Sequence, residues 1–329
     1  MTESVSVALC THNGARFIEE QLESILAQTV PVREIVLSDD ASTDDTVDLA
    51  RRTGGERAAL TVLRHDPPLG VTANFERAIR ATTGDVVVLS DQDDRWRADR
   101  VERGLARLRA SSDAELCFSD ARLVGPSGDP LGGSLVERLR VTPAERAALA
   151  DGDLFDALVR RNLVTGATVL FRRTLLDAAL PFPAEWVHDE WLAIVAAATS
   201  SVAFEPDTLV DYRLHEANVI GMRAPTLGVK VRRVLERDGG RTAGLARRAE
   251  VLAERLAALP DGPSFDGVRR TRLSTTAREK ARIERRRAGF ASARWRRVVP
   301  VLRLLAEGSY ERYTSQGRFE AIRDMLQPR

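Results

Sequence analysis

The sequence of 329 residues contains little cysteine, few aromatic side chains and no long apolar run. Its two cysteines, Cys10 and Cys117, each lie in an apolar segment, which indicates buried, reduced thiols and argues against a disulfide or a thiolate metal site. No apolar stretch approaches the roughly 20 residues that a membrane-spanning helix needs. The first residues lack a basic segment followed by an apolar one, so we expect no secretion signal and a cytoplasmic location.

Two familiar phosphate-binding loops are also missing from the sequence. The first expected strand, residues 5–10, is followed by Thr11-His12-Asn13-Gly14, which is neither a Gly-x-Gly-x-x-Gly nor a Gly-Lys-Ser/Thr loop. This argues against a dinucleotide site and a P-loop. A nucleotidyltransferase would need a Gly-rich loop bearing Arg or Lys at the same place. A bound nucleotide must therefore be held by side chains and a metal ion.

Apolar strands and amphipathic helices alternate along most of the chain at intervals typical of βαβ units. This pattern predicts an α/β fold with a mostly parallel, Rossmann-like sheet and helices on both faces. Ser42 is expected to cap the second helix. The expected strands are residues 5–10, 35–37, 60–63, 85–89, 116–118, 167–171, 202–204 and 209–213, and the expected helices are residues 17–26, 42–52, 71–81, 98–109 and 190–198.

The charge is unevenly distributed although the net charge is only +1. Residues 223–329 contain 26 basic and 12 acidic residues, in a pattern that is mainly helical. This predicts a separate, basic helical region at residues 222–329. Its basic, amphipathic faces suit contact with an anionic membrane surface, and they equally suit packing on the rest of the chain or on a second subunit. Nucleic-acid binding is disfavoured because the aromatic residues follow no recognition pattern.

Three carboxylates follow the buried strand at residues 85–89. Asp91, Asp93 and Asp94 are badly placed for stability because like charges repel and must stay hydrated. They are well placed to hold a divalent cation on a phosphorylated substrate. We expect Asp93 to be exposed and Asp94 to cap the following helix. Ligands of an open parallel sheet bind beyond the carboxyl ends of its strands, where residues 11–14 and 38–42 are also polar. For Asp39-Asp40 alone, a capping turn is the competing interpretation.

Several motifs resemble those of the family 2 inverting glycosyltransferases of the GT-A fold. They occur in the same order along the chain, and at the same distances from one another, as in that family. They are Val5–Gly14, Gln21–Thr29, Leu37–Asp44 and Ser90–Trp96, whose Ser-Asp-Gln-Asp-Asp-x-Trp form is shared with the bacterial rhamnosyltransferase-like subgroup, as is Gly70-Val71-Thr72-Ala73-Asn74-Phe75. The resemblance covers residues 1–221 and implies a catalytic GT-A domain there.

The resemblance also implies roles for individual residues. Asp40, in preference to Asp39, would accept a hydrogen bond from the base. Asp91 would face the ribose or a metal-bound water, and Asp93 would ligate Mg²⁺ or Mn²⁺ on the diphosphate. The implied contacts with the nucleotide sugar are Thr11, Asn13, Asp39, Asp40, Asn74, Asp91 and Arg213.

The general base is expected in Trp186-Val187-His188-Asp189-Glu190-Trp191. The family places its catalytic base at the position of Asp189, with Glu190 as the rival candidate. A carboxylate at a helix N-terminus is equally consistent with a simple cap. His188 departs from the commoner Glu-Asp form of the family. A carboxylate that takes the proton of an attacking hydroxyl accelerates such a reaction by ~10²–10⁴.

The last motif is Tyr212-Arg213-Leu214-His215-Glu216-Ala217-Asn218-Val219-Ile220-Gly221. In the family, the histidine here is a ligand of the metal or the diphosphate, which implies this role for His215. Arg213 would pair with the phosphates. The alternative is that His215 is only a turn residue.

Together these features predict an inverting, metal-dependent glycosyltransferase. Its donor would be a nucleoside-diphosphate sugar, with dTDP-rhamnose suggested by the subgroup, and its acceptor a hydroxyl of a cell-surface glycan or lipid-linked precursor. The competing hypothesis is a catalytically silent nucleotide-sugar-binding or scaffold protein of the same fold. Contact with the cytoplasmic face of the membrane would come from the basic C-terminal region.

Overall fold

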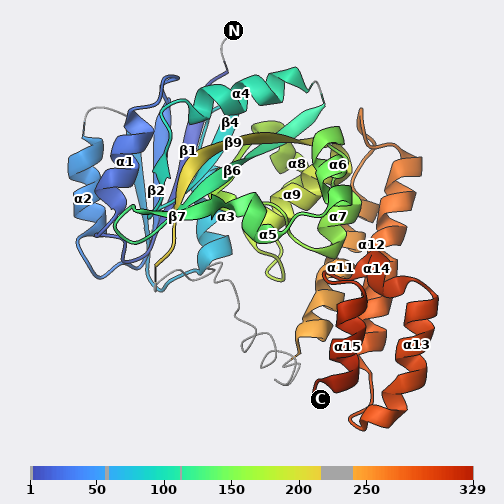
Figure 1. The fold of residues 1–329 in the computed structure, drawn as a ribbon. Helices are drawn as coiled ribbons and strands as arrows, with labels where there is room; N and C mark the ends of the chain where they lie inside the picture. The colour runs from blue at the N-terminus through green and yellow to red at the C-terminus, as the bar shows by residue number, and fades with distance from the viewer. Residues whose placement is uncertain (1–2, 56–58, 112, 216–239, 329) are drawn as a thin grey trace. The chain divides into compact units, whose positions relative to one another are not determined.

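The computed structural model describes residues 3–55, 59–111, 113–215 and 240–328 (Figure 1). The chain forms two compact units. The first, here called the sheet unit, comprises Met1–Leu154 and Leu163–Met222. The second, the helical unit, comprises Phe155–Asn162 and Arg223–Arg329. A short segment from the middle of the sequence thus belongs to the C-terminal unit, which the sequence pattern did not indicate.

Within the described residues, the sheet unit contains a nine-stranded sheet of order β3-β2-β1-β4-β8-β6-β9-β5, with β7 paired to β6. Neighbouring strands from β3 to β4 are parallel, β8 is antiparallel to both of its neighbours, and β6 is parallel to β9. This confirms the mostly parallel α/β sheet. The strands are β1 (Val5–Thr11), β2 (Glu34–Asp40), β3 (Ala59–His65), β4 (Val86–Asp91), β5 (Arg95–Trp96), β6 (Ala114–Val124), β7 (Pro130–Ser134), β8 (Val169–Arg172) and β9 (Ser201–Arg213).

The order of the strands explains why helices cover both faces of the sheet. The chain steps from β1 to β2 and β3 in one direction and then returns past them to β4. Right-handed crossovers therefore place α1 and α2 on one face and α3 on the other, where α3 packs against α9. The helices of this unit are α1 (Ile18–Leu26), α2 (Thr46–Gly54), α3 (Val71–Ala81), α4 (Arg100–Ala110), α5 (Leu135–Leu139), α6 (Pro143–Asp151), α8 (Leu176–Ala179) and α9 (His188–Thr199), with 3₁₀ turns η1 (Gly166–Thr168) and η2 (Arg173–Leu175).

The core of the sheet unit lies around β1 and α9. Every residue of β1 is buried, as expected for a central parallel strand that is covered on both faces. Helix α9 is buried all round from Trp191 to Ala198, since a helix without a polar face is stable only inside a protein. Its first turn, with Asp189 and Glu190, is held by this rigid apolar helix.

Two predicted helix caps are wrong. Helix α2 begins at Thr46, and the Ser42 hydroxyl oxygen accepts the backbone N–H of Asn13 (2.8 Å) instead of an N–H of the helix. Helix α4 begins at Arg100, and Asp94 lies too far upstream to cap it. Its Oδ1 instead accepts the backbone N–H of Arg213 (3.0 Å). Both side chains are used for tertiary contacts, which a local sequence pattern does not reveal.

The helical unit confirms the predicted C-terminal helical region. Helices α11 and α12 pack along each other and α13 packs against α14 and α15. No helix in the described parts of the chain is long and apolar enough to cross a membrane. The helices are α7 (Phe155–Arg160), α11 (Arg241–Ala258), α12 (Gly267–Ala288), α13 (Val298–Ala306), α14 (Ser309–Tyr313) and α15 (Arg318–Leu326), with η3 (Arg294–Arg297) before α13.

Candidate active site

The polar ends of β1, β2 and β4 lie side by side at one edge of the sheet. In the strand registers, Thr11 lies opposite Asp39, and Cys10 lies opposite Asp91. The Thr11 hydroxyl donates to Asp39 Oδ1 (2.9 Å). The predicted convergence of three polar strand ends is therefore present, and it follows from the parallel pairing of these strands.

The loop after β1 is tied to the loops after β2 and β4. Asn13, in the left-handed region at φ 49°, accepts the Thr43 N–H at its Oδ1 (2.9 Å). The Gln92 amide accepts the His12 N–H (2.8 Å) and donates to the His12 carbonyl (3.0 Å). A Cβ at Gly14 would lie only 2.2 Å from Gln92 Oε1, so a larger residue here would displace the Gln92 amide from its two bonds to His12. The loop that is expected to line the nucleotide pocket is thus fixed by its neighbours.

The two carboxylates at the end of β2 have separate partners. Asp39 is fully buried and also accepts the Ser42 N–H (3.0 Å). Asp40 accepts the N–H groups of Leu69 (2.6 Å) and Gly70 (2.9 Å), just before α3. Asp39 therefore orders its own turn, whereas Asp40 ties β2 to the approach to α3. The predicted contact of Asp40 with a base remains a prediction, for which its oxygens retain further lone pairs.

Two buried side chains near this edge carry polar atoms that no protein group satisfies. Asn74 on α3 donates from Nδ2 to the Ser38 carbonyl (2.9 Å), but its Oδ1 has no partner. His188 is stacked on Phe75 at 3.8 Å between ring centroids, and neither of its ring nitrogens has a partner. Burial lowers the pKa of His188, so the ring is neutral at pH 7. Buried polar atoms without partners are typical of a site that receives a ligand or water.

The carboxylates after β4 form a dense negative cluster. Burial and the charges of Asp93 and Asp189 raise the pKa of Asp91 to about 7. Burial and the charges of Asp93 and Asp91 raise the pKa of Asp94 well above its usual range. The expectation that Asp93 is exposed is wrong, because only 9% of the residue is accessible. It is buried because β9 returns over the loop that carries it.

A buried arginine lies beside this cluster, and the sequence analysis missed it. The Arg100 guanidinium lies 3.8 Å from the centre of the Trp96 ring and donates to the Leu89 carbonyl (3.2 Å). Its burial lowers its pKa to about 9, whereas Asp94 and Asp91 act in the opposite direction. Arg100 therefore offsets part of the negative charge. In an arginine-rich helix, no sequence signal distinguishes this arginine from its exposed neighbours.

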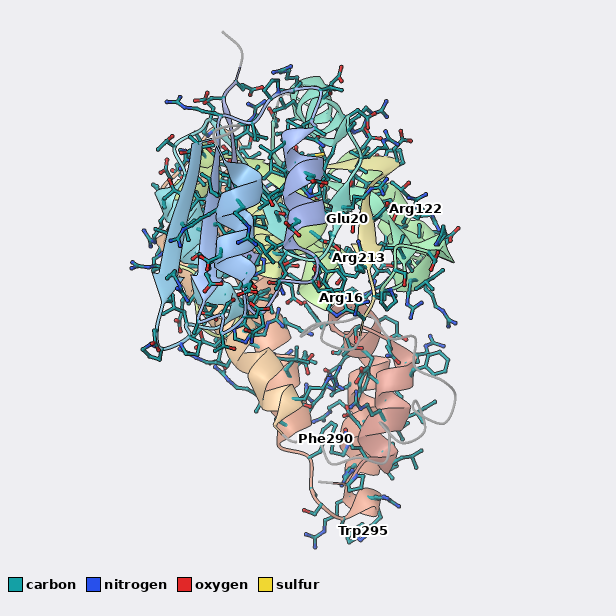
Figure 2. The ribbon with its side chains drawn as sticks, turned by 90° about the vertical axis from the view of Figure 1, so that its left-hand side faces the viewer. Arg16, Glu20, Arg122, Arg213, Phe290 and Trp295 are labelled. Atoms are coloured by element: carbon teal, nitrogen blue, oxygen red, sulfur yellow. The ribbon has the colours of Figure 1, made fainter. Side chains whose placement is uncertain are left out.

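The end of β9 brings two predicted residues to the loop after β4. His215 Nε2 lies 2.7 Å from Asp93 Oδ2. Arg213, next to Glu20 in Figure 2, donates to the Asp93 carbonyl (2.7 Å), the Glu20 carboxylate (2.6 Å) and the Pro126 carbonyl (3.1 Å). Arg213 thus clamps the acidic loop. Its pairing with phosphates remains a prediction that requires an exchange of these partners. The rest of this motif, residues 216–221, lies outside the described residues.

The donor chemistry of this region fits a divalent cation. Among the described residues, no three His, Cys, Asp or Glu side chains form a metal-binding group. Asp93 and His215 nevertheless present an oxygen and a nitrogen side by side. Mg²⁺ and Mn²⁺ sites of this kind combine one or two protein ligands with substrate phosphates and water. A cation would also offset the repulsion that raises the pKa values of Asp91 and Asp94.

Asp189 faces the same edge from the N-terminus of α9. Its Oδ2 accepts the Gly166 N–H (2.8 Å), and its Oδ1 accepts the N–H of Glu190 (2.7 Å). The charge of Asp189 contributes to the raised pKa of Asp91, which links it to the carboxylates after β4. Two backbone N–H groups thus fix the orientation of the side chain. A base at this point is held in one orientation.

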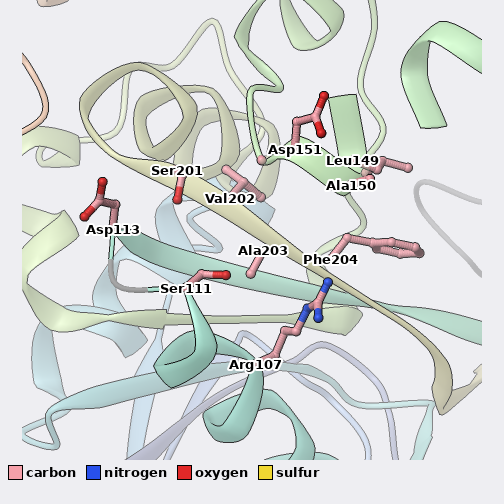
Figure 3. Close-up of a pocket in the computed structure, with 11 residues that line it drawn as sticks. Arg107, Ser111, Asp113, Leu149, Ala150, Asp151, Ser201, Val202, Ala203 and Phe204 are labelled. Carbon is pink, nitrogen blue, oxygen red and sulfur yellow. The ribbon is translucent and has the colours of Figure 1, made fainter. Parts of the chain in front are cut away.

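A cavity of about 280 Å³ lies elsewhere in the sheet unit (Figure 3). It is bordered by the starts of β6 and β9 and by the ends of α4 and α6, with Arg107, Asp151 and Phe204 among its lining residues. Because β6 and β9 run parallel to β4, their starts lie at the edge opposite the acidic cluster. None of the predicted site residues lines this cavity, so it is separate from the candidate active site.

The mostly parallel sheet with helices on both faces is a GT-A type fold, and the comparisons agree. Residues 6–161 match the family model for glycosyl transferase family 2. The S. aureus TarS fragment 1–349 in complex with UDP-GlcNAc superposes with a TM-score of 0.59 at 15% identity, over 98% of this chain and 89% of that chain. The mannosyltransferase PcManGT from Pyrobaculum calidifontis, in complex with GDP-Man and Mn²⁺, superposes with a TM-score of 0.50 at 21% identity, over 99% of this chain and 85% of that chain. These likenesses confirm the fold.

Curated relatives share the sequence over part of their length. TuaG of Bacillus subtilis, a putative teichuronic acid biosynthesis glycosyltransferase, is 31% identical over 39% of this chain and 50% of its own. The dTDP-rhamnosyl transferase RfbG of Shigella flexneri is 32% identical over 36% of this chain and 43% of its own. Uncharacterized protein Rv1520 of Mycobacterium tuberculosis is 27% identical over 64% of this chain and 59% of its own. The chain therefore spans about half the length of these relatives.

Proposed function

We propose that this protein is an inverting, metal-dependent glycosyltransferase that moves a sugar from a nucleoside-diphosphate donor to a hydroxyl group. The observation that carries the proposal is the position of Asp189. The Asp189 carboxylate is fixed by two backbone N–H groups, and it is close enough to Asp91 to raise the pKa of Asp91. A base thus faces the sheet edge that is expected to hold the donor. We assign the catalytic domain to residues 1–221 and the helical region to residues 222–329.

In the proposed reaction, Asp189 takes the proton of the acceptor hydroxyl while the oxygen of that hydroxyl attacks the anomeric carbon of the donor sugar. The bond from that carbon to the diphosphate breaks on the opposite side, so a single displacement inverts the anomeric centre. Asp93 and His215 would hold the cation, which supplies Lewis-acid stabilisation of the departing diphosphate. Thr11, Asn13, Asp39, Asp40 and Asn74 would surround the nucleotide, with Asp91 at the ribose.

We propose dTDP-rhamnose as the donor, supported by the rhamnosyltransferase-like motif at Ser90–Trp96 and by the similarity to RfbG. The name of TuaG supports an acceptor in cell-surface glycan synthesis. A lipid-linked precursor would require the protein to work at the membrane, and the basic region from residue 222 would provide peripheral contact with its cytoplasmic face.

A thermal-shift panel of nucleotide sugars, with and without Mn²⁺, tests this function first. A ligand that binds only the native state raises the melting temperature, and we expect dTDP-rhamnose to do so only with the metal. Release of dTDP in the presence of acceptor would then show transfer. Binding without any release, for every donor and acceptor class tried, would instead support the catalytically silent protein.

A further inference from the structure

Helix α15 turns its polar residues inward and its large apolar residues outward. Glu320 and Asp324 are each 1% exposed. In contrast, Phe319 is 72% exposed, Ile322 53% and Leu326 44%. A surface helix ordinarily has the reverse arrangement, with apolar side chains toward the core. The apolar side of α15 therefore lacks the burial that its composition calls for.

The inward carboxylates have a clear structural role. Arg287 on α12 is buried and binds Asp324 (2.7 Å) and Glu320 (2.8 Å) through its guanidinium. Tyr310 also donates its hydroxyl to Asp324 (2.8 Å). Removing Arg287 would take away the buried cation that both carboxylates share. The network fixes the rotation of α15 about its axis and with it the outward direction of the apolar side chains.

The neighbouring segment, which includes α13, also exposes large apolar side chains. Helix α13, which packs against α15, buries Val301 and Leu304 but leaves Val299 73% and Leu302 58% exposed. Trp295, in the turn before α13, is 72% exposed and lies at the end of the helical unit in Figure 2. Helix α13 is thus apolar on both sides, although one side faces solvent. We call Trp295, Val299, Leu302, Phe319, Ile322 and Leu326 the outer apolar residues.

The charged residues around them are almost all arginines. Between residues 294 and 326, the exposed or partly exposed acidic side chains among the described residues are Glu307, which pairs with Arg286, and Glu311, which pairs with Arg318. The exposed basic residues in the same segment are Arg294, Arg296, Arg303, Arg312 and Arg318. A second copy that docked through the same surface would bring these arginines against each other. An anionic bilayer attracts them and accepts the apolar side chains between them.

We infer that the outer apolar residues of α13 and α15 form the surface through which this protein inserts into the headgroup region of an anionic membrane. This inference rests on the proposed peripheral membrane contact and assigns it to one surface. Arginines would bind lipid phosphates, while Trp295 and Phe319 enter the boundary between headgroups and acyl chains. Contact of this kind involves no membrane-spanning helix.

Trp295 offers a direct readout in the full-length protein. The other three tryptophans, Trp96, Trp186 and Trp191, are at most 8% exposed and should not respond to lipid. Vesicles of phosphatidylglycerol and phosphatidylcholine in equal parts should shift the emission to the blue at about 50 mM salt, where charges are weakly screened. Brominated acyl chains should quench it. Trp295→Phe should abolish both responses but retain vesicle binding.

The surface itself is tested by Leu302→Ser/Ile322→Ser, two exposed positions whose change should leave the fold intact. Vesicle affinity should fall at least tenfold, whereas the matched control Val268→Ser, at a 79% exposed position on α12, should bind normally. Unchanged binding of the double variant would overturn the assignment of the surface. Absence of vesicle binding by the full chain, or a concentration-dependent dimer that the double variant dissociates, would overturn membrane insertion altogether. Nucleotide-sugar binding, measured without lipid, tests the transferase proposal separately.

Discussion

His215 Nε2 lies 2.7 Å from Asp93 Oδ2, although the two residues are 122 positions apart in the sequence. The contact forms because β9 returns beside β6 and delivers its last residues to the loop after β4. Both residues are predicted metal ligands from separate motifs. Their juxtaposition supports a single cation site with ligands from each motif.

Asp93→Asn should weaken metal-dependent binding of a nucleoside diphosphate at least tenfold, because the amide loses the charge that a hard cation requires. Since Asp93 is buried, the isosteric amide is a better test than alanine. Calorimetry with dTDP and Mn²⁺ measures the effect. Asp48→Asn, at an exposed position on α2, is the matched control. Wild-type affinity in Asp93→Asn would show that this carboxylate is not a metal ligand.

Asp189→Asn should reduce turnover by on the order of 10² or more and leave donor affinity nearly unchanged, because the amide preserves shape but cannot accept the proton. Steady-state kinetics and donor calorimetry provide the two measurements. Glu190→Gln is the matched comparison on the same helix turn. If the loss of turnover occurs in Glu190→Gln and not in Asp189→Asn, the base is Glu190.

Gly166→Ala should impair turnover without removing the base. An added Cβ would lie 3.0 Å from His188 Nε2 and 3.3 Å from Asp189 Cβ, so the carboxylate must shift. We expect turnover to fall roughly tenfold, since small misplacements of catalytic groups carry large costs. Gly244→Ala in α11, where an added Cβ meets nothing within 4 Å, should leave turnover unchanged. Equal activity of the two variants would mean that the position of Asp189 is not critical.

Acid should destabilise the helical unit. Burial alone would raise the pKa of Glu320, but Arg241 and Arg287 lower it to about 2, below its value of about 4.3 in an unfolded chain. This stabilisation is fully present above about pH 5 and is lost as the pH falls toward 2, on the order of 3 kcal/mol. Urea unfolding followed by far-ultraviolet circular dichroism at several pH values measures it. Stability that stays constant from pH 5 to pH 3 would contradict the depressed pKa.

Arg287→Met should destabilise the same unit by about 3–5 kcal/mol at neutral pH, because it removes the buried cation that Glu284, Glu320 and Asp324 share. The matched control is Arg282→Met, which removes an exposed pair with Glu279 on the same helix and should cost less than about 1 kcal/mol. Denaturant unfolding of both variants provides the comparison. Similar stabilities would mean that the buried network contributes little.

The sequence by itself determined the alternation of strands and helices, and with it the parallel sheet and the edge where polar strand ends meet. This is possible because hydrophobic period and parallel pairing are local or regular properties. Local patterns misplaced the start of α2 and the roles of Ser42 and Asp94, because these side chains accept the N–H groups of Asn13 and Arg213 from distant segments instead of capping helices.

Only the tertiary structure decided the partners of the charged residues. Arg100 and Arg287 are indistinguishable by sequence from the many exposed arginines, and the motif that singles out Arg213 does not give its partners in the fold. Each of the three is nevertheless buried against particular carboxylates or carbonyls. The outward direction of Phe319 and Ile322 likewise follows from the inward ion network of α15. Burial and pairing depend on contacts between distant segments, and these are set by how the elements pack and not by their local composition.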